Sequence, residues 1–367
     1  MHAGEGNHRG KTIKGRGSGG WLPGRFARTV AEAVDDGWHE RDTEDEAALP
    51  PQTEVREERA RSIISRNQSP DIPFSQSLNP YRGCEHGCSY CFARPSHAYL
   101  DLSPGLDFET KIFAKTNAPE LLRAELARPA YVCTPIALGI NTDSYQPIER
   151  GLQLTRRVIE VLAETRHPFS LITKNALVER DIDLLAPMAS LNLVHVYLSV
   201  TTLDNRLSAK LEPRASAPHS RLKAMRKLSD AGIPVGVMFA PAIPWINDAE
   251  LEAVLEAARE HGASSAGYVL LRLPHEVAPL FRDWLDAHAP QRAEHVMSSI
   301  RQQRGGKDYD AKFGTRFRGE GVYADLLARR FALAKKRLGY DAGRYSRALD
   351  CSLFTPPRKP SPQGELF

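Results

Sequence analysis

The feature that most constrains the fold is an alternation of two residue patterns between about Ser75 and Leu285. Short apolar runs rich in β-branched residues alternate with longer segments in which apolar residues recur every three or four positions. The first pattern predicts buried strands, and the second predicts helices that cover them. Strands are expected at residues 111–115, 132–140, 169–173, 193–201, 234–240 and 266–273, with a further short extended piece just before Cys84. Helices are expected at residues 119–126, 151–163, 179–188, 221–231 and 248–261.

Six or so β/α units in succession predict an α/β fold, and the form we expect is a partial (β/α)6 barrel of the TIM type. An open doubly wound sheet is the alternative, which is weakened because no Gly-x-Gly-x-x-Gly follows the first strand. Active sites of barrels lie where the strands end, so polar residues at those positions are expected in the site. They are Asn141-Thr142-Asp143, Lys174-Asn175 and the residues from Ser199 to Thr202.

The composition excludes some classes of protein. No run approaches the roughly 18 to 20 apolar residues that a membrane span requires, so no membrane association is expected. Five cysteines are too few and odd in number for a disulfide scaffold, and no apolar signal core begins the chain. We therefore expect a cytoplasmic protein.

Charge runs flank the predicted barrel, which we place at residues 61–290. Residues 1–60 are expected to form a poorly ordered arm that is basic in its first half and then acidic, with eleven acids against three bases in residues 31–59. Residues 291–350 form a basic, aromatic region, in which residues 291–347 hold 14 Lys and Arg against six Asp and Glu. Residues 351–367 form a Pro-rich tail.

The basic C-terminal region has two interpretations. Cations interleaved with aromatic rings are typical of nucleic-acid binding, because the cations hold phosphates and the rings stack on bases. Alternatively, residues 322–338 form a basic helix that lies over the barrel with its aromatic side chains in the core.

Three of the five cysteines, Cys84, Cys88 and Cys91, fall within eight residues. The short loops between them can bring their thiolates to one inorganic centre. A structural zinc site would need a fourth ligand, which His86 or His97 could supply. A [4Fe-4S] cluster held by three cysteines would keep one iron open as a reaction site, and Tyr90 before the last cysteine and the β/α series that follows favour this cluster.

At these residues the chain resembles the radical S-adenosylmethionine (radical SAM) superfamily, whose motif is Cys-x3-Cys-x2-Cys with an aromatic before the third cysteine. The resemblance implies that the open iron is chelated by the amino and carboxylate groups of SAM. It also implies that the reduced cluster passes one electron to the sulfonium, which releases methionine and a 5′-deoxyadenosyl radical that abstracts a substrate hydrogen. Such a radical needs a water-excluded cavity, which a barrel offers. An electron donor, a reductase or a flavodoxin-type protein, is implied as a partner.

A closer resemblance, over about residues 79–247, is to the subgroup that contains spore photoproduct lyase and is often called DNA repair photolyase-like. The run from Asn79 to Arg94 looks like that of an uncharacterised bacterial branch. On this resemblance, Lys174 approaches the SAM carboxylate and Asp143 and Asn141 can accept from its ammonium group. The other positions that the resemblance places near SAM are Tyr90, Thr142, Ser199, Ala240 of Ala240-Pro241, and Glu212 of Glu212-Pro213 with Arg214 in place of the usual glycine.

Two further features bear on the substrate. Spore photoproduct lyase has a hydrogen-donating cysteine shortly before its Ser/Thr-Asp pair, where this chain has Gly139 or Ile140, so thymine-dimer repair is not expected. Gln363 to Phe367 resemble the peptide with which many bacterial DNA-processing proteins bind the sliding clamp, and the prolines before them form an extended tether. Nucleic acid is therefore the expected substrate class, with a protein or a small metabolite as the alternative. A nucleic-acid-binding protein with a structural zinc site is the alternative that lacks radical chemistry.

Overall fold

The computed structural model describes residues 12–27, 51–340 and 348–357. Its main sheet has the strand order β10-β9-β8-β7-β6-β3-β2. All neighbouring pairs are parallel except β2 with β3, so six strands run in one direction. The strands are β2 (Ile64–Arg66), β3 (Gln76–Leu78), β6 (Ile136–Leu138), β7 (Phe169–Thr173), β8 (Val194–Ser199), β9 (Val235–Ala242) and β10 (Ser265–Leu270).

The strand order decides between the two predicted architectures. The parallel strands follow one another across the sheet in chain order, without the reversal that defines a doubly wound sheet. The sheet ends at β2 and β10 and does not close. The fold is thus the predicted partial barrel, whose strand ends lie together at one edge.

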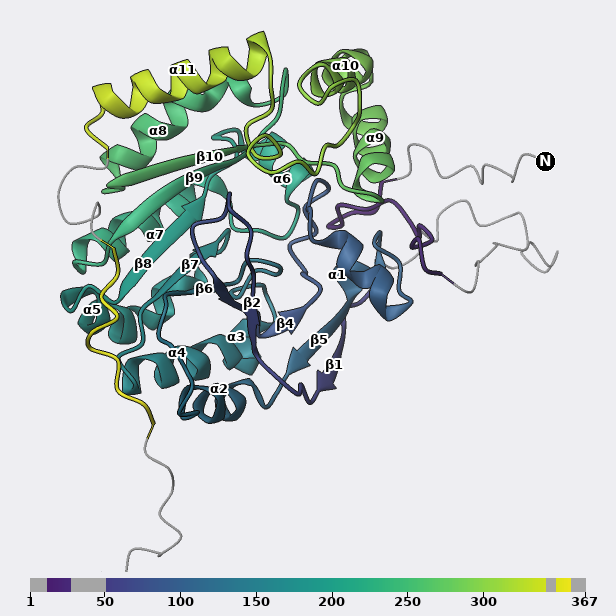
Figure 1. Ribbon diagram of the computed structural model, residues 1–367. Helices are drawn as coiled ribbons and strands as arrows, with labels where there is room; N and C mark the ends of the chain where they lie inside the picture. Colours follow the sequence, from purple (N-terminus) through teal and green to yellow (C-terminus); the bar gives the residue numbers. More distant parts are fainter. Residues whose placement is uncertain (1–11, 28–50, 341–347, 358–367) are drawn as a thin grey trace, which may run out of the picture.

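Helices cover the outer side of this sheet (Figure 1). Each presents one apolar face; in α4, for example, Val158, Ile159 and Leu162 are fully buried. The covering helices are α2 (Ala118–Leu126), α4 (Leu154–Glu164), α5 (Ile182–Ser190), α7 (Pro218–Asp230) and α8 (Leu251–Glu260). All five lie within a few residues of the predicted helices. Shorter helices are η1 (Arg94–Leu100), α1 (Asp107–Thr110), α3 (Glu149–Leu152), η2 (Ala176–Asp181), α6 (Asn205–Leu211) and η3 (Asp248–Glu250).

One predicted barrel strand lies elsewhere. Strand β5 (Lys111–Lys115) has the predicted bounds but belongs to a separate sheet of order β1-β5-β4, with β1 (Glu54–Glu58) and β4 (Tyr81–Arg82). Its place in the barrel is taken by β3, whereas β4, the short extended piece just before Cys84, pairs with β5 in the separate sheet. A local apolar pattern indicates a strand but not its partner, and the partner β1 is almost wholly exposed.

Parts of the predicted N-terminal arm are ordered against the barrel. Residues 51–60 contain β1, and residues 12–27 contact the segment that follows the cysteines. The Leu22 N–H donates to Ser103 Oγ over 2.9 Å, and the Arg25 N–H donates to Glu276 Oε1 over 3.0 Å. The expectation of a poorly ordered arm is therefore wrong for these two stretches, since their backbone groups find partners in the barrel. The rest of the arm lies outside the described residues.

A second core joins the C-terminal helices to the cysteine loop. Helix α9 (Val277–His288), η4 (Pro290–Arg292) and α10 (Ala293–Gln302) follow β10. Phe281 and Met297 are buried in the same cluster as Cys88 and Tyr90. The hydrophobic core thus continues across the predicted boundary at residue 290.

Helix α11 (Val322–Arg337) packs on α8, as the packing interpretation of this segment predicts. Tyr323 donates to Asp248 Oδ2 over 2.5 Å, and the rings of Phe331 and Tyr268 lie 4.7 Å apart. Arg330 pairs with Glu252 over 2.6 Å. Its aromatic residues and much of its charge are therefore used inside the fold.

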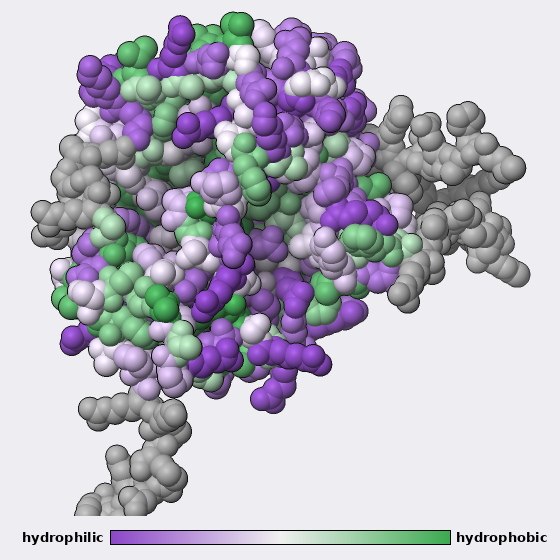
Figure 2. Space-filling model, viewed as in Figure 1, coloured by the Kyte–Doolittle hydropathy of each residue, from purple (hydrophilic) through white to green (hydrophobic). Residues whose placement is uncertain are grey.

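The surface seen in Figure 2 is a mosaic of hydrophilic residues with smaller hydrophobic areas between them. In the part of the chain that the structure describes, every helix is too short or too polar to span a bilayer.

Candidate active site

The cysteine loop lies between β4 and η1, beside the carboxyl edge of the main sheet. Cys84 and Cys88 are buried and Cys91 is partly exposed, and none is in a disulfide. The Cys84 N–H donates to Phe108 O over 2.9 Å, and Ser89 N donates to Leu211 O over 3.1 Å. Backbone bonds to two different segments thus fix the loop that carries the thiols.

Arg94 anchors this loop from below, a role that the sequence did not reveal. Its side chain is fully buried and donates from Nε to Cys88 O over 2.9 Å. It also donates to the Pro104 and Gly105 carbonyls and pairs with buried Glu109 over 2.5 Å. The position of Cys88 therefore depends on a buried ion pair between two residues that are 15 positions apart in the sequence.

Burial opposes ionisation of the three thiols more strongly than the neighbouring cations favour it. Burial raises the pKa of all three thiols. For Cys88, burial and the nearby Glu212 carboxylate together raise the pKa to about 12. The neighbouring thiols also raise the pKa of Cys84. Thiolates are the ligand form of cysteine, so a cationic centre among these groups would offset the cost of ionising them together. The donor set fits such a centre.

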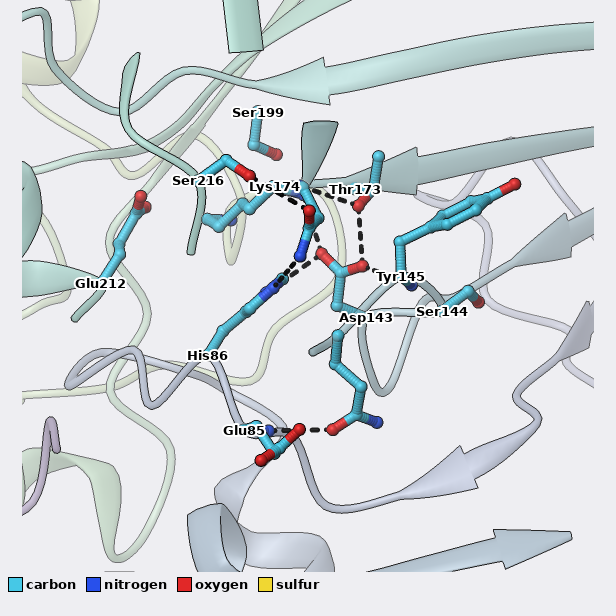
Figure 3. Close-up of polar contacts among 12 residues, drawn as sticks. Glu85, His86, Asp143, Ser144, Tyr145, Thr173, Lys174, Ser199, Glu212 and Ser216 are labelled. Carbon is cyan, nitrogen blue, oxygen red and sulfur yellow. Dashed lines mark hydrogen bonds and ion pairs between the residues drawn. The ribbon is translucent and has the colours of Figure 1, made fainter. Parts of the chain in front are cut away.

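His86 and Asp143 join the cysteine loop to the sheet. The His86 Nδ1 atom lies 3.3 Å from Asp143 Oδ2, and its Nε2 lies 3.3 Å from Asn175 Nδ2 (Figure 3). Asp143 also accepts from Thr173 Oγ1 and the Lys174 N–H, both over 2.7 Å. Although burial opposes its ionisation, His86 and these donors lower the pKa of Asp143 to about 2. Both carboxylate oxygens are therefore engaged by protein donors, and Asp143 orders the loop ends instead of keeping an open acceptor for an ammonium group.

Glu212 is engaged in the same way. It is buried and accepts from Tyr90 Oη, from Thr201 Oγ1 over 2.5 Å, and from the Arg221 guanidinium. Arg221 is itself fully buried and donates to Ser199 O over 2.9 Å. This network ties Tyr90 of the cysteine loop to the end of β8, and Arg221 was not predicted as part of it.

Arg214 does not pair with Glu212. The Arg214 guanidinium lies 3.0 Å from Glu85 Oε1, and the backbone N–H of Arg214 donates to the His86 carbonyl over 3.2 Å. Arg214 therefore braces the cysteine loop from the side that carries Glu85.

Two other predicted residues, Lys174 and Thr142, and one that was not predicted, Ser89, have polar groups that remain available for a ligand. The Lys174 ammonium lies 5.9 Å from the centre of the Tyr90 ring and forms no ion pair with a described residue. Buried Thr142 Oγ1 and buried Ser89 Oγ have no hydrogen-bond partner. Buried polar atoms are costly without a partner, so these atoms mark a place for a polar ligand next to the cysteines.

Three further predicted positions lie around the same edge. Ser199 is buried at the end of β8, and Ala240 lies in β9 with its carbonyl 3.4 Å from Thr201 Oγ1. Asn141 is exposed, and its N–H donates to Asn79 Oδ1 over 2.8 Å. Of the three residues, only Asn141 is exposed to solvent, so it lies at the rim of the site.

The zinc alternative finds little support. Both ring nitrogens of His86 have other partners, and His97 Nε2 lies 3.0 Å from the Lys111 carbonyl. Among the described residues, no set of three or more His, Cys, Asp or Glu side chains converges on a single metal position. Cysteines around an iron–sulfur cluster bind different iron atoms, so they need not converge on one point.

The two remaining cysteines lie together, far from this site. Cys133 precedes β6 at the opposite edge of the sheet, and its thiol is in hydrogen-bonding contact with that of Cys351. Phe354 packs on Tyr131 beside them, with ring centres 5.6 Å apart. Neither thiol is placed to return a hydrogen atom at the cysteine loop.

Comparison with known proteins gives the family. Residues 78–258 match the radical SAM superfamily. The chain carries a radical SAM domain. This match confirms the resemblance of the cysteine motif to that family, and for the matched residues it implies SAM and an iron–sulfur cluster as cofactors.

Two relatives are uncharacterised proteins. One, from Mycobacterium tuberculosis (strain ATCC 25618 / H37Rv), is 37% identical over 222 residues, which cover 60% of this chain and 65% of that protein. The other, from Methanocaldococcus jannaschii, is 26% identical over 197 residues, which cover 54% of this chain and 71% of that protein. The radical SAM chain thus matches just under two thirds of the length of its mycobacterial relative.

Among solved structures, spore photoproduct lyase complexed with dinucleoside spore photoproduct is similar in fold. The TM-score is 0.56 at 16% identity, and the match covers 78% of this chain and 80% of that one. At this identity the likeness shows the fold, a partial barrel, and leaves the substrate open.

Proposed function

We propose that this protein holds a [4Fe-4S] cluster through Cys84, Cys88 and Cys91, cleaves SAM reductively, and acts on nucleic acid. The observation that carries the proposal is the set of three disulfide-free cysteines at the carboxyl edge of the radical SAM sheet. When bound, the reduced cluster supplies the electron that splits SAM into methionine and a 5′-deoxyadenosyl radical, which takes a hydrogen atom from the substrate.

The chain's own residues would bind and orient SAM. Lys174 offers a cation without an acidic partner among the described residues, which suits the SAM carboxylate. The Thr142 and Ser89 hydroxyls offer buried polar atoms that need partners, and Ser199 lies at the neighbouring strand end. Asp143 and Glu212 would not contact SAM themselves. Asp143 accepts from the Lys174 backbone N–H and Glu212 accepts from Tyr90 Oη, so they hold these two residues in place.

The same loop would exclude water. Cys88 and Tyr90 are buried in one cluster with Leu211, Ile243 and Leu271. A radical formed beside these apolar side chains is shielded from solvent, which would otherwise quench it.

Apart from the three proposed cluster ligands, the chain has no thiol at this edge that could return a hydrogen atom to the product. Gly139 adopts a φ of +79°, and a Cβ added there would lie 2.7 Å from Ser144 Oγ. A cysteine at this position would therefore be strained and crowded. This supports a reaction different from thymine-dimer repair.

The test is anaerobic reconstitution with iron and sulfide, followed by SAM and dithionite, with 5′-deoxyadenosine and bound iron as readouts. Wild type is expected to bind about four iron atoms and release 5′-deoxyadenosine, while Cys88→Ala does neither. Cys133→Ala is the matched control, because it removes a cysteine at the opposite edge of the sheet and should behave as wild type. Colourless wild-type protein with one bound zinc would contradict the proposal.

Two partner predictions belong to this proposal. A reductase or flavodoxin-type protein would replace dithionite as electron donor. The sliding-clamp peptide, Gln363 to Phe367, lies outside the described residues and stays a prediction.

A further inference from the structure

The rim of the barrel next to the cysteines carries an arginine in an unusual setting. Arg272 follows β10 at the carboxyl edge of the sheet. The segment between α10 and α11 comes back to this edge, where the Leu270 N–H donates to Phe317 O over 2.9 Å (Figure 1). Part of the basic C-terminal region therefore lies at the mouth of the barrel, while α11 packs on its outside.

Aromatic rings surround the Arg272 guanidinium. Its Cζ lies 4.6 Å from the ring centre of Phe317, 5.3 Å from that of Phe92 and 5.8 Å from that of Tyr309. One of its terminal nitrogens donates to Tyr309 Oη over 3.1 Å. Phe92 directly follows the cluster ligand Cys91 and is 43% exposed. The arginine thus joins the C-terminal segment to the cysteine loop.

The charge of Arg272 is not matched. It forms no ion pair with a described residue, and its Nε is buried without a hydrogen-bond partner. Asp308, next to Tyr309, pairs with Arg282, and Asp71 pairs with Arg316. A partly buried cation without a counter-ion is costly, and a bound anion would relieve that cost.

One exposed ring lies on the C-terminal segment of this site, and a second follows the neighbouring strand. Phe313 is 56% exposed and stacks on Arg316 with a distance of 4.9 Å from Cζ to the ring centre. Trp245 follows β9, the strand beside β10, and is 47% exposed. A planar guanidinium between exposed rings is suited to a phosphate flanked by bases, because rings stack on bases of any sequence.

We propose that Arg272, with Phe92 and Tyr309, binds a nucleotide unit of single-stranded nucleic acid at the barrel mouth. The arginine would bind the backbone phosphate and the exposed rings would stack on the adjoining bases. The segment between α10 and α11 carries five Lys and Arg against three Asp and Glu, and this excess of positive charge favours a polyanion over a peptide. This inference rests on the proposed function, since it supplies the substrate site for that reaction.

The test measures binding without SAM or reductant. Reconstituted protein is titrated into fluorescein-labelled 12-nucleotide single-stranded DNA, and into RNA of the same sequence, with anisotropy read at several salt concentrations. Wild type should bind in a salt-dependent way. Arg272→Gln should weaken binding about tenfold or more and reduce the slope of log affinity against log salt by about one.

The matched control is Lys312→Gln, which removes one positive charge from the same segment. The Lys312 ammonium is exposed, lies 4.0 Å from Glu320 and has no contact with Arg272, so affinity should change less than about threefold. Arg272→Lys keeps the charge and loses the planar fork, and should fall between wild type and Arg272→Gln. If thermal melting shows Arg272→Gln to be unfolded, Tyr309→Leu takes its place, with Tyr309→Phe as the variant that keeps the ring and the affinity.

Equal losses from Arg272→Gln and Lys312→Gln would overturn the proposal, as would wild-type protein that binds neither DNA nor RNA. The DNA and RNA titrations tell which nucleic acid is preferred. Release of 5′-deoxyadenosine without nucleic-acid binding would refute this site alone. Arg272-dependent binding without SAM cleavage would instead refute the proposed radical chemistry.

Discussion

The buried ion pair of Arg94 and Glu109 offers a direct test of what holds the cysteine loop. Both side chains are fully buried, and the guanidinium also donates to three carbonyls, one of them that of Cys88. Glu109→Gln keeps the shape and one acceptor oxygen but leaves the arginine charge without its counter-ion. Breaking a buried pair in this way costs about 3 to 5 kcal/mol. Because the glutamine retains one acceptor oxygen, we expect a loss of unfolding free energy at the lower end, about 3 kcal/mol.

The assay is urea unfolding of the metal-free chain, with Arg94→Met and the double variant completing a mutant cycle. The double variant should lose less stability than the sum of the two single variants, because it leaves no buried charge unpaired. Glu294→Gln is the matched control: its partner Arg301 lies 2.5 Å away, but Glu294 is 81% exposed, so the change should stay within about 0.5 kcal/mol. A loss below about 1 kcal/mol for Glu109→Gln, or additive losses in the cycle, would refute the role assigned to this pair.

Three further predictions concern regions outside the cysteine loop. Burial lowers the pKa of His167 to about 4, so the unfolded chain takes up a proton first as the pH falls below 6.5. The free energy of unfolding should therefore fall by up to about 3 kcal/mol between pH 6.5 and pH 4. In urea unfolding at pH 7.5 and pH 5, the His167→Gln variant should lose less stability between the two pH values than the wild type does. Diamide should take two electrons and two protons from Cys133 and Cys351 and join them in a disulfide, seen by peptide mass spectrometry and absent in the Ser variant of either. A Cβ at Gly17 would lie 1.6 Å from the Gly87 carbonyl oxygen, so Gly17→Ala should release residues 12–27 and speed their cleavage in limited trypsin digestion, whereas an unchanged digestion rate would show that this contact does not hold them.

Much of the fold follows from local patterns. Strand β7 has the predicted bounds because its alternating buried residues and the polar Lys174 after it are visible in the chain itself. Strand β5 was predicted equally well as a strand but assigned to the wrong sheet. Its partner β1 begins 57 residues earlier in an acidic, exposed segment, and pairing at that separation leaves no periodic signal.

The site was predicted in position more than in role. The residues that follow β6, β7 and β8 do lie together, because parallel strands end at one edge. Asp143 and Glu212 were expected near the ligand, yet their oxygens accept from protein donors. The sequence shows that a carboxylate is at a strand end, but its partners come from distant segments, and Arg94 and Arg221 could not be found for the same reason.

Groups that remain without partners locate the ligands better than groups that are merely polar. The inner set, Thr142 Oγ1, Ser89 Oγ and the Lys174 ammonium, lies beside the cysteines. The outer set is Arg272 with its rings. The two sets are adjacent in the chain, because Phe92 of the outer set directly follows Cys91. A nucleotide bound at the rim would therefore contact the residue next to Cys91, the proposed cluster ligand, and a short-lived radical needs its substrate close by before solvent quenches it.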